Sequence, residues 1–266
     1  MSNRIENMFS ACRRDGRKAL IGYLTMGCPT CEASEKLADR MIECGADMLE
    51  LGVPFSDPTA DGPVIQRAGN LALSNGATLE KILTVAGNLR RRHPDTPMIL
   101  FSYFNVMLNR GLEKLTAELE TVGVDGILAV DLPFEEEGEL LPLCRLHGLA
   151  LIPLVSPATG VERARKITAG KSGFVYCIMV RGVTGVRSSL ADGAARELAG
   201  FRSAVAPLPL AAGFGISSPE TAREAAEHAD AVVVGSAVVS RMMDAASPDE
   251  GVRECGNFIA ALKEVL

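Results

Sequence analysis

Apolar residues recur along the chain in eight short runs, and each run is followed by a longer stretch with helical periodicity. The apolar runs lie at residues 19–25, 47–53, 98–104, 126–132, 149–155, 174–179, 208–212 and 231–235. The helical stretches lie at 31–45, 78–93, 111–123, 134–148, 160–170, 192–201, 218–229 and 251–266. Ser, Thr or Asp precedes several of them and Gly follows most, as helix capping favours. Because parallel strands need long crossover connections, this alternation predicts repeated βαβ units.

The repeated units favour a single α/β domain over residues 1–266, because no linker and no change of composition interrupts them. We predict a closed (β/α)8 barrel, the TIM-barrel architecture. Residues 1–12 are amphipathic, with Ile5, Met8, Phe9 and Cys12 at helical spacing, and should form an extra N-terminal helix that caps the bottom of the barrel. The alternative is an open doubly wound sheet, but the loop after the first run lacks the G-x-G-x-x-G pattern.

Composition narrows the class of protein. The 266 residues carry a formal charge of −6, which argues against nucleic-acid binding because a backbone binder needs a basic surface. The chain shows no secretory signal and no apolar run long enough to span a membrane. Its seven cysteines are odd in number and scattered, as in a reduced protein, and the Cys28–Cys31 pair lacks the other ligands of a zinc site. We therefore expect a cytoplasmic protein without a metal.

The loops that follow the last strands carry the glycines expected of an anion site. Residues 211–218 read AAGFGISS and residues 233–238 read VVGSAV. In a barrel, these two loops are the usual place for a phosphate, held by backbone N–H groups at a helix N-terminus. Residues 181–192 form a long polar loop after the sixth run, with the composition of a lid that could close over such a site.

The second apolar run and the loop after it each contain a candidate catalytic carboxylate, Glu50 and Asp61. Side chains alternate along a strand, so Met48, Glu50 and Gly52 should point into the barrel while their neighbours face the helices. A buried, unpaired Glu50 would act as a general acid or base, and the alternative is an ion pair with an unidentified cation. Asp61 ends a loop that three prolines stiffen. It could face the pocket opposite Glu50 or simply form a turn.

Other polar residues exclude two kinds of chemistry. The three histidines, at positions 93, 147 and 228, fall in or beside predicted helices, which disfavours a metal site or a histidine base. None of the seven lysines ends a predicted strand, which disfavours a Schiff-base aldolase. What remains is acid–base chemistry without a cofactor, performed by carboxylates on a phosphorylated molecule.

Several motifs together carry a resemblance to a known family. In chain order they are LELGVPFSDPTADGPVIQRA, YFN, GVDGILAVDLPFEE, GVTG, GFGIS and VVGSAVV. With these motifs the chain resembles the tryptophan synthase α-subunit family over essentially its whole length. The resemblance implies a lyase of tryptophan biosynthesis that cleaves indole-3-glycerol phosphate to indole and glyceraldehyde 3-phosphate. It also implies a β-subunit partner in an αββα heterotetramer, with pyridoxal phosphate belonging to that partner and no cofactor in this chain.

The resemblance also assigns roles to matching residues. Glu50 would be the general acid and base, and Asp61 would hold the indole N–H. The indole pocket would be lined by Tyr23, Leu128, Tyr176 and Phe214. The phosphate would be bound by backbone N–H groups of Gly185, Gly215, Gly235 and Ser236. Thr184 on the lid would meet Asp57 on closure, and the rim around Pro54, Asp57, Pro58 and Asn105 would dock the β subunit.

Departures from the family pattern leave other functions open. Cys28 stands where Asp is usual, Val106 where Pro is common, and Met179 and Arg181 precede GVTG in place of small or polar residues. Arg181 lies at the hinge of the lid and could alter closure or reach the phosphate. A stand-alone lyase that releases free indole is one alternative. A catalytically altered paralogue that serves as a ligand-binding or regulatory subunit is the other.

Overall fold

Parallel strands form one continuous sheet at the centre of the molecule. The computed structural model describes residues 3–178, 192–213 and 215–266. Within them lie nine strands, paired in the order β5-β4-β3-β2-β1-β9-β8-β7-β6. Their bounds are β1 Ala19–Thr25, β2 Met48–Gly52, β3 Met98–Ser102, β4 Gly126–Ala129, β5 Ala150–Leu151, β6 Leu154–Val155, β7 Val175–Ile178, β8 Leu210–Gly213 and β9 Ala231–Val234. Every pair is parallel, as the βαβ pattern predicts.

The sheet closes into a barrel through a strand that proline divides. The sequence predicts one strand at 149–155, but β5 and β6 are separate pieces on either side of Pro153. Proline has no N–H to give to a ladder, so the pairing pauses there. The chain itself continues across the gap: the Ile152 N–H donates to Ile127 at 2.8 Å, and Tyr176 donates to the Pro153 carbonyl at 2.9 Å. The two pieces therefore act as one strand, and the eight-stranded barrel is confirmed.

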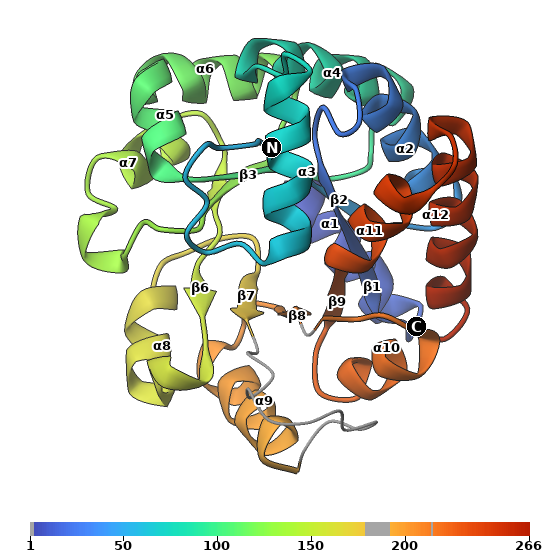
Figure 1. Cartoon of the computed structure of the whole chain (residues 1–266). Coiled ribbons are helices and arrows are strands. Elements are labelled where there is room, and N and C mark those ends of the chain that lie inside the picture. The colour runs from blue at the N-terminus through green and yellow to red at the C-terminus, as the bar shows by residue number, and fades with distance from the viewer. Residues whose placement is uncertain (1–2, 179–191, 214) are drawn as a thin grey trace.

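Helices form the outer layer around the strands (Figure 1). Their bounds are α1 Arg4–Arg14, α2 Cys31–Glu43, α3 Pro63–Ser74, α4 Leu79–Arg92, α5 Phe104–Arg110, α6 Leu112–Val122, α7 Leu140–Leu146, α8 Val161–Thr168, α9 Asp192–Val205, α10 Pro219–Ala226, α11 Ser236–Asp244 and α12 Pro248–Lys263. Two short 3₁₀ turns, η1 Phe134–Glu136 and η2 Pro157–Thr159, lie in loops. Apolar residues between the strands and these helices make up the largest core cluster.

The helical boundaries correct three expectations. The stretch 134–148 forms η1 and the shorter helix α7, because Gly138 and Pro142 favour a late helix start. Helix α3 was not predicted, since Pro63 suggested only a stiff loop, although proline is favoured at the first position of a helix. Helix α5 lies inside a region assigned to the end of a strand and its loop. The remaining predicted helices are present, with shifted ends.

Helix α1 closes one end of the barrel, as the amphipathic pattern predicts. Ile5, Phe9 and Cys12 are buried, and they join the apolar cluster formed by side chains inside the barrel. The Phe9 ring packs against Phe174 with the ring centres 5.9 Å apart. Since α1 precedes β1, this end is the one where the strands begin. The opposite end, where the strands finish, is free to carry loops from β2, β3, β8 and β9.

Candidate active site

Glu50 points into the barrel from β2. Its neighbour of equal parity, Met48, belongs to the interior cluster, whereas Leu49 and Leu51 pack under the helices. Glu50 is fully buried, and neither carboxylate oxygen has a hydrogen-bond partner among the described residues. Burial raises its pKa from the ordinary 4.5 to about 8. Within the described ranges no cation forms the ion pair that was the structural alternative, so the carboxyl is mainly protonated at neutral pH.

Two tyrosines lie beside Glu50. Tyr23 on β1 is directly opposite Glu50 in the ladder, and its ring meets Phe101 edge-on with the centres 5.1 Å apart. Tyr176 on β7 has a pKa well above its ordinary value, raised first by burial and then by Glu50 and Tyr23. The two rings and the carboxyl group therefore share one space inside the barrel, at the end where the strands finish.

Glycines make room for these rings. A Cβ atom at Gly52 would lie 2.4 Å from the Tyr23 hydroxyl oxygen, and one at Gly213 would lie 2.6 Å from the Tyr176 hydroxyl oxygen. Both distances are shorter than atoms of this kind tolerate. Glycine at the ends of β2 and β8 thus leaves space for the Tyr23 and Tyr176 rings beside these strand ends.

Asp61 is held at the mouth by a tyrosine that the sequence analysis did not single out. The Tyr103 hydroxyl accepts the Ala60 N–H at 2.9 Å. It also bonds to the half-buried Asp61 carboxylate: burial raises the pKa of Asp61, and the Tyr103 hydrogen bond partly opposes that. The Gln66 side chain fixes the same loop by donating to the Asp61 carbonyl at 2.9 Å. Tyr103 directly follows β3, and a polar aromatic side chain at a strand end was the signal that could have identified it.

Burial raises the pKa of the Tyr23 phenol, and the negative charges of Asp61 and Glu50 both raise it further. Asp61 and Glu50 are therefore both within electrostatic reach of one ring. That the two acids flank a single pocket, and the roles they would have there, stay predictions.

The start of α11, where the phosphate site is predicted, lies next to Tyr23. Gly235 precedes α11, and a Cβ atom there would lie 3.3 Å from the Tyr23 side chain. No side chain of the described residues caps the start of α11, and Ser236, its first residue, is exposed. Gly215 is exposed and has a φ of +62°, which glycine adopts freely. Uncapped N–H groups and the helix dipole make the start of α11 suitable for an anion.

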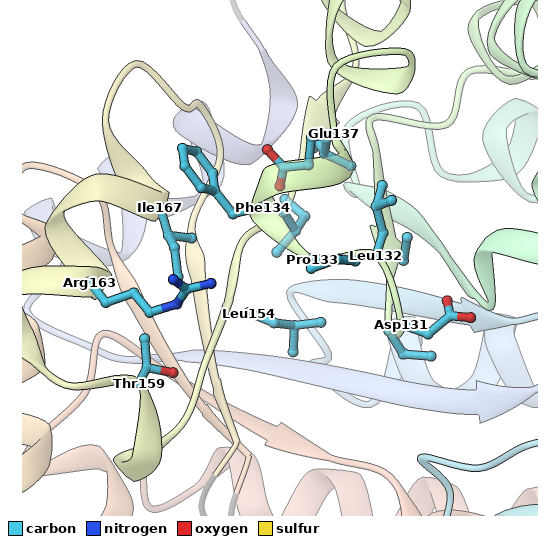
Figure 2. Close-up of a pocket in the computed structure, with 13 residues that line it drawn as sticks. Asp131, Leu132, Pro133, Phe134, Glu137, Leu154, Thr159, Arg163 and Ile167 are labelled. Atoms are coloured by element: carbon cyan, nitrogen blue, oxygen red, sulfur yellow. The ribbon is translucent and has the colours of Figure 1, made fainter.

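A cavity of about 300 Å³ lies beside the barrel interior, between the loop after β4 and helix α8. Figure 2 shows Arg163 and Thr159 on one side of it and Asp131 and Leu132 on the other. Its inner wall includes Leu154, which packs against the interior cluster that contains the buried Leu128. Neither carboxylate of the mouth lines this cavity, so it adjoins the reacting groups without containing them.

The predicted docking residues on the rim around the mouth differ in exposure. Asp57 and Asn105 are exposed, Pro58 is half-buried and Pro54 is buried. Asp131, which the sequence analysis did not identify, anchors this rim by accepting the Phe104 N–H at the start of α5 with a distance of 2.7 Å. Exposed polar groups on a fixed loop and a fixed helix suit a docking surface.

Four of the predicted site residues, and one departure from the family pattern, fall outside the described residues. They are Thr184, Gly185, Phe214, Arg181 and Met179. The assignments on the lid, and part of those for the indole and phosphate contacts, therefore stay predictions.

The residues that the structure describes include neither a cluster of metal ligands nor a helix of membrane-spanning character. No group of three or more His, Cys, Asp or Glu side chains there could hold a metal ion. His93 bonds to Asp39 at 2.8 Å and His147 to Glu120 at 2.7 Å, away from the mouth. No helix in the same ranges has the length and apolar character to cross a bilayer.

Comparison with known proteins gives consistent matches. The family model for the tryptophan synthase alpha chain matches residues 9–265. The tryptophan synthase alpha chain of Geobacter sulfurreducens is 42% identical over 264 residues, covering 99% of each chain. The tryptophan synthase subunit alpha of Legionella pneumophila str. Paris superposes with a TM-score of 0.88 at 33% identity, covering 100% of this chain and 98% of the other. A Mycobacterium tuberculosis tryptophan synthase structure gives 0.88 at 32% identity, covering 99% of each.

Proposed function

Because the chain belongs to the tryptophan synthase alpha chain family, whose members are lyases, we propose that it cleaves indole-3-glycerol phosphate into indole and glyceraldehyde 3-phosphate. The observation that carries this proposal is Glu50, a carboxyl group buried without a partner at the mouth of the barrel. A retro-aldol cleavage needs one group that gives and takes protons and another that stabilises positive charge on the indole ring. Glu50 and Asp61 supply both.

Glu50 begins the reaction in its protonated form. It gives its proton to indole C3, and the ring becomes a cationic indolenine. The resulting carboxylate then takes the proton of the glycerol C3′ hydroxyl. As that O–H bond breaks, its electrons form the aldehyde carbonyl, the bond between C3′ and indole C3 breaks, and its electron pair returns to the ring. Glu50 is protonated again at the end, so the cycle balances without an oxidant or reductant. A pKa of about 8 is close enough to neutrality for both transfers.

Asp61 stabilises the cationic ring. Its carboxylate accepts a hydrogen bond from the indole N–H, and its negative charge offsets the positive charge that develops after C3 is protonated. Tyr103 fixes the carboxylate, so little reorganisation is needed when the charge appears. Asp61 remains charged throughout because it does not exchange protons with the substrate.

The other predicted residues hold the two ends of the substrate. Tyr23, Tyr176 and Leu128 surround the indole, with Phe214 as a further wall. The phosphate is bound by backbone N–H groups of Gly215, Gly235, Ser236 and Gly185. Support for this orientation comes from the start of α11, which lies against Tyr23. Thr184 contacts Asp57 when the lid closes.

The family implies a β-subunit partner for this chain. We place its docking surface on the rim formed by Pro54, Asp57, Pro58 and Asn105, with Arg181 on the neighbouring lid. The complex is an αββα heterotetramer in the cytoplasm, and pyridoxal phosphate is bound by the partner. The proposed cleavage itself uses no cofactor, since each proton and electron pair is accounted for by the substrate and Glu50.

An assay of indole release, with and without a β subunit, tests the proposal. Glu50→Gln should lower the rate to below about 1% of the wild type, and Asp61→Asn by about a hundredfold, in line with the loss of an acid–base group or a charge stabiliser. Glu254→Gln, at an exposed position on α12, is the control and should keep full activity. Binding of indole-3-glycerol phosphate without any release of indole by the wild type would instead favour a binding subunit.

A further inference from the structure

A second cavity lies at the end of the barrel where the strands begin, opposite the proposed active site. Its volume is about 290 Å³. Lys18 immediately precedes β1, Asp230 immediately precedes β9, and Arg202 lies in the last turn of α9. Phe9 and Cys12 of α1 contribute buried apolar atoms to the lining. The cavity therefore has an apolar floor and a polar wall built from segments far apart in the sequence.

Cations predominate in the wall of this cavity. Arg13, Arg17, Lys18 and Arg202 line it, whereas Asp230 is the acidic residue among the lining side chains. Asp230 is already engaged, because it pairs with Arg202 at 2.8 Å and accepts the Leu210 N–H at 3.0 Å. The surplus of positive charge here contrasts with a chain whose overall charge is −6.

Two acidic side chains near the cavity, Asp47 and Asp15, each contact two cationic side chains. Arg17 contacts Asp47 at 2.7 Å, and the same Asp47 carboxylate lies 2.5 Å from Lys263 and accepts the Leu20 N–H at 2.8 Å. Asp15 lies 3.3 Å from Arg14 and 3.8 Å from Arg17. These acids therefore have no unshared negative charge left for the cavity.

Two of the lining cations have no acidic partner among the described residues. The half-buried Lys18 ammonium donates to the Ala229 carbonyl at 2.7 Å, and no described carboxylate lies within 4.0 Å of it. Burial lowers the pKa of Lys18, Arg202 lowers it further, and Asp230 only partly compensates. The exposed Arg13 side chain makes neither an ion pair nor a hydrogen bond to a described residue. Both cations are thus available to a ligand.

We propose that this cavity binds a small polyanion that carries phosphate groups. Guanidinium groups match phosphate oxygens in pairs, and an ammonium adds a point charge. The volume is several times the roughly 30 Å³ that a water molecule occupies in the liquid, which leaves room for a diphosphate. Because the cavity and the mouth lie at opposite ends of the barrel, both sites can be filled at once. The apolar floor suits a ligand with a carbon skeleton beside its phosphates.

Titration calorimetry with pyrophosphate in phosphate-free, low-salt buffer tests the proposal. Ser236→Asp serves as the background, because a carboxylate at the start of α11 repels anions from the mouth and is itself tolerated at a helix N-terminus. In this background we expect one bound pyrophosphate per chain. Arg13→Gln should weaken its binding about tenfold, the loss expected for one charged hydrogen bond.

Arg14→Gln is the matched control. Arg14 is the next residue on the same helix and is also exposed; it pairs with Asp15 and does not line the cavity. Its replacement should change the affinity less than about twofold, as expected for a surface charge. Both positions are exposed, so thermal melts should show folded variants. Absence of binding in the Ser236→Asp background would overturn the proposal, as would equal weakening by the two arginine variants, which would indicate diffuse attraction.

Discussion

Replacing Glu50 by glutamine should stabilise the fold while it removes activity. In the folded protein the pKa of Glu50 is about 8, against an ordinary value of 4.5. Between these values the unfolded chain has an ionised Glu50 and the folded chain a protonated one, so stability falls as pH rises. Each pH unit above 4.5 lowers the free energy of unfolding by about 1.4 kcal/mol. The loss amounts to about 3 kcal/mol at pH 7 and about 5 kcal/mol above pH 8. Glutamine is neutral at every pH and avoids this cost.

Urea unfolding of the wild type and Glu50→Gln at pH 5, 7 and 8.5 measures the effect. The two proteins should have similar free energies of unfolding at pH 5. As the pH rises, the free energy of unfolding of the variant should exceed that of the wild type by an increasing amount. The gain is large beside the 5–15 kcal/mol stability typical of a domain. Glu254→Gln, which alters an exposed carboxylate, provides the control and should show no such trend. A constant difference between wild type and Glu50→Gln across this pH range would refute the reasoning.

Two other substitutions test the groups around the site and the base of the barrel. Tyr103→Phe removes the hydroxyl that accepts the Ala60 N–H and bonds to the Asp61 carboxylate. We expect kcat/KM to fall about tenfold. The lower limb of its pH profile should move to higher pH, because the pKa of Asp61 rises when this hydrogen bond is lost. An unchanged profile would count against that positioning. Asp125→Ala leaves the half-buried Arg90 without its 2.8 Å carboxylate partner and should cost about 3 kcal/mol in urea unfolding, whereas a loss below about 1 kcal/mol would contradict it.

Much of the fold follows from local patterns in the chain. Apolar runs alternating with helical stretches predict a barrel because each unit buries its own apolar face against the next. The parity of side chains along β2 places Glu50 inside before any coordinate is known. The spacing of Ile5, Phe9 and Cys12 likewise predicts the helix that closes the base. In each case the information lies within a few consecutive residues.

What the sequence did not reveal depends on contacts between distant segments. Tyr103 and Asp61 meet because the loops after neighbouring strands lie side by side, and no local pattern links the two residues. Arg13 resembles an ordinary solvated helix end until Arg202, from a helix much later in the chain, lies beside the same cavity. The interruption at Pro153 could have been anticipated, since proline within an apolar run usually ends strand pairing.

The pairing of β1 with β9 has a consequence for synthesis of the protein. Ala19 lies beside Ala231, so one edge of β1 has no partner until β9 is translated, roughly two hundred residues later. Until then the nascent sheet has exposed hydrogen-bonding groups along that edge, which are prone to pair with other chains. We therefore expect the growing polypeptide to depend on chaperones or on rapid completion, and fragments that stop before β9 to aggregate.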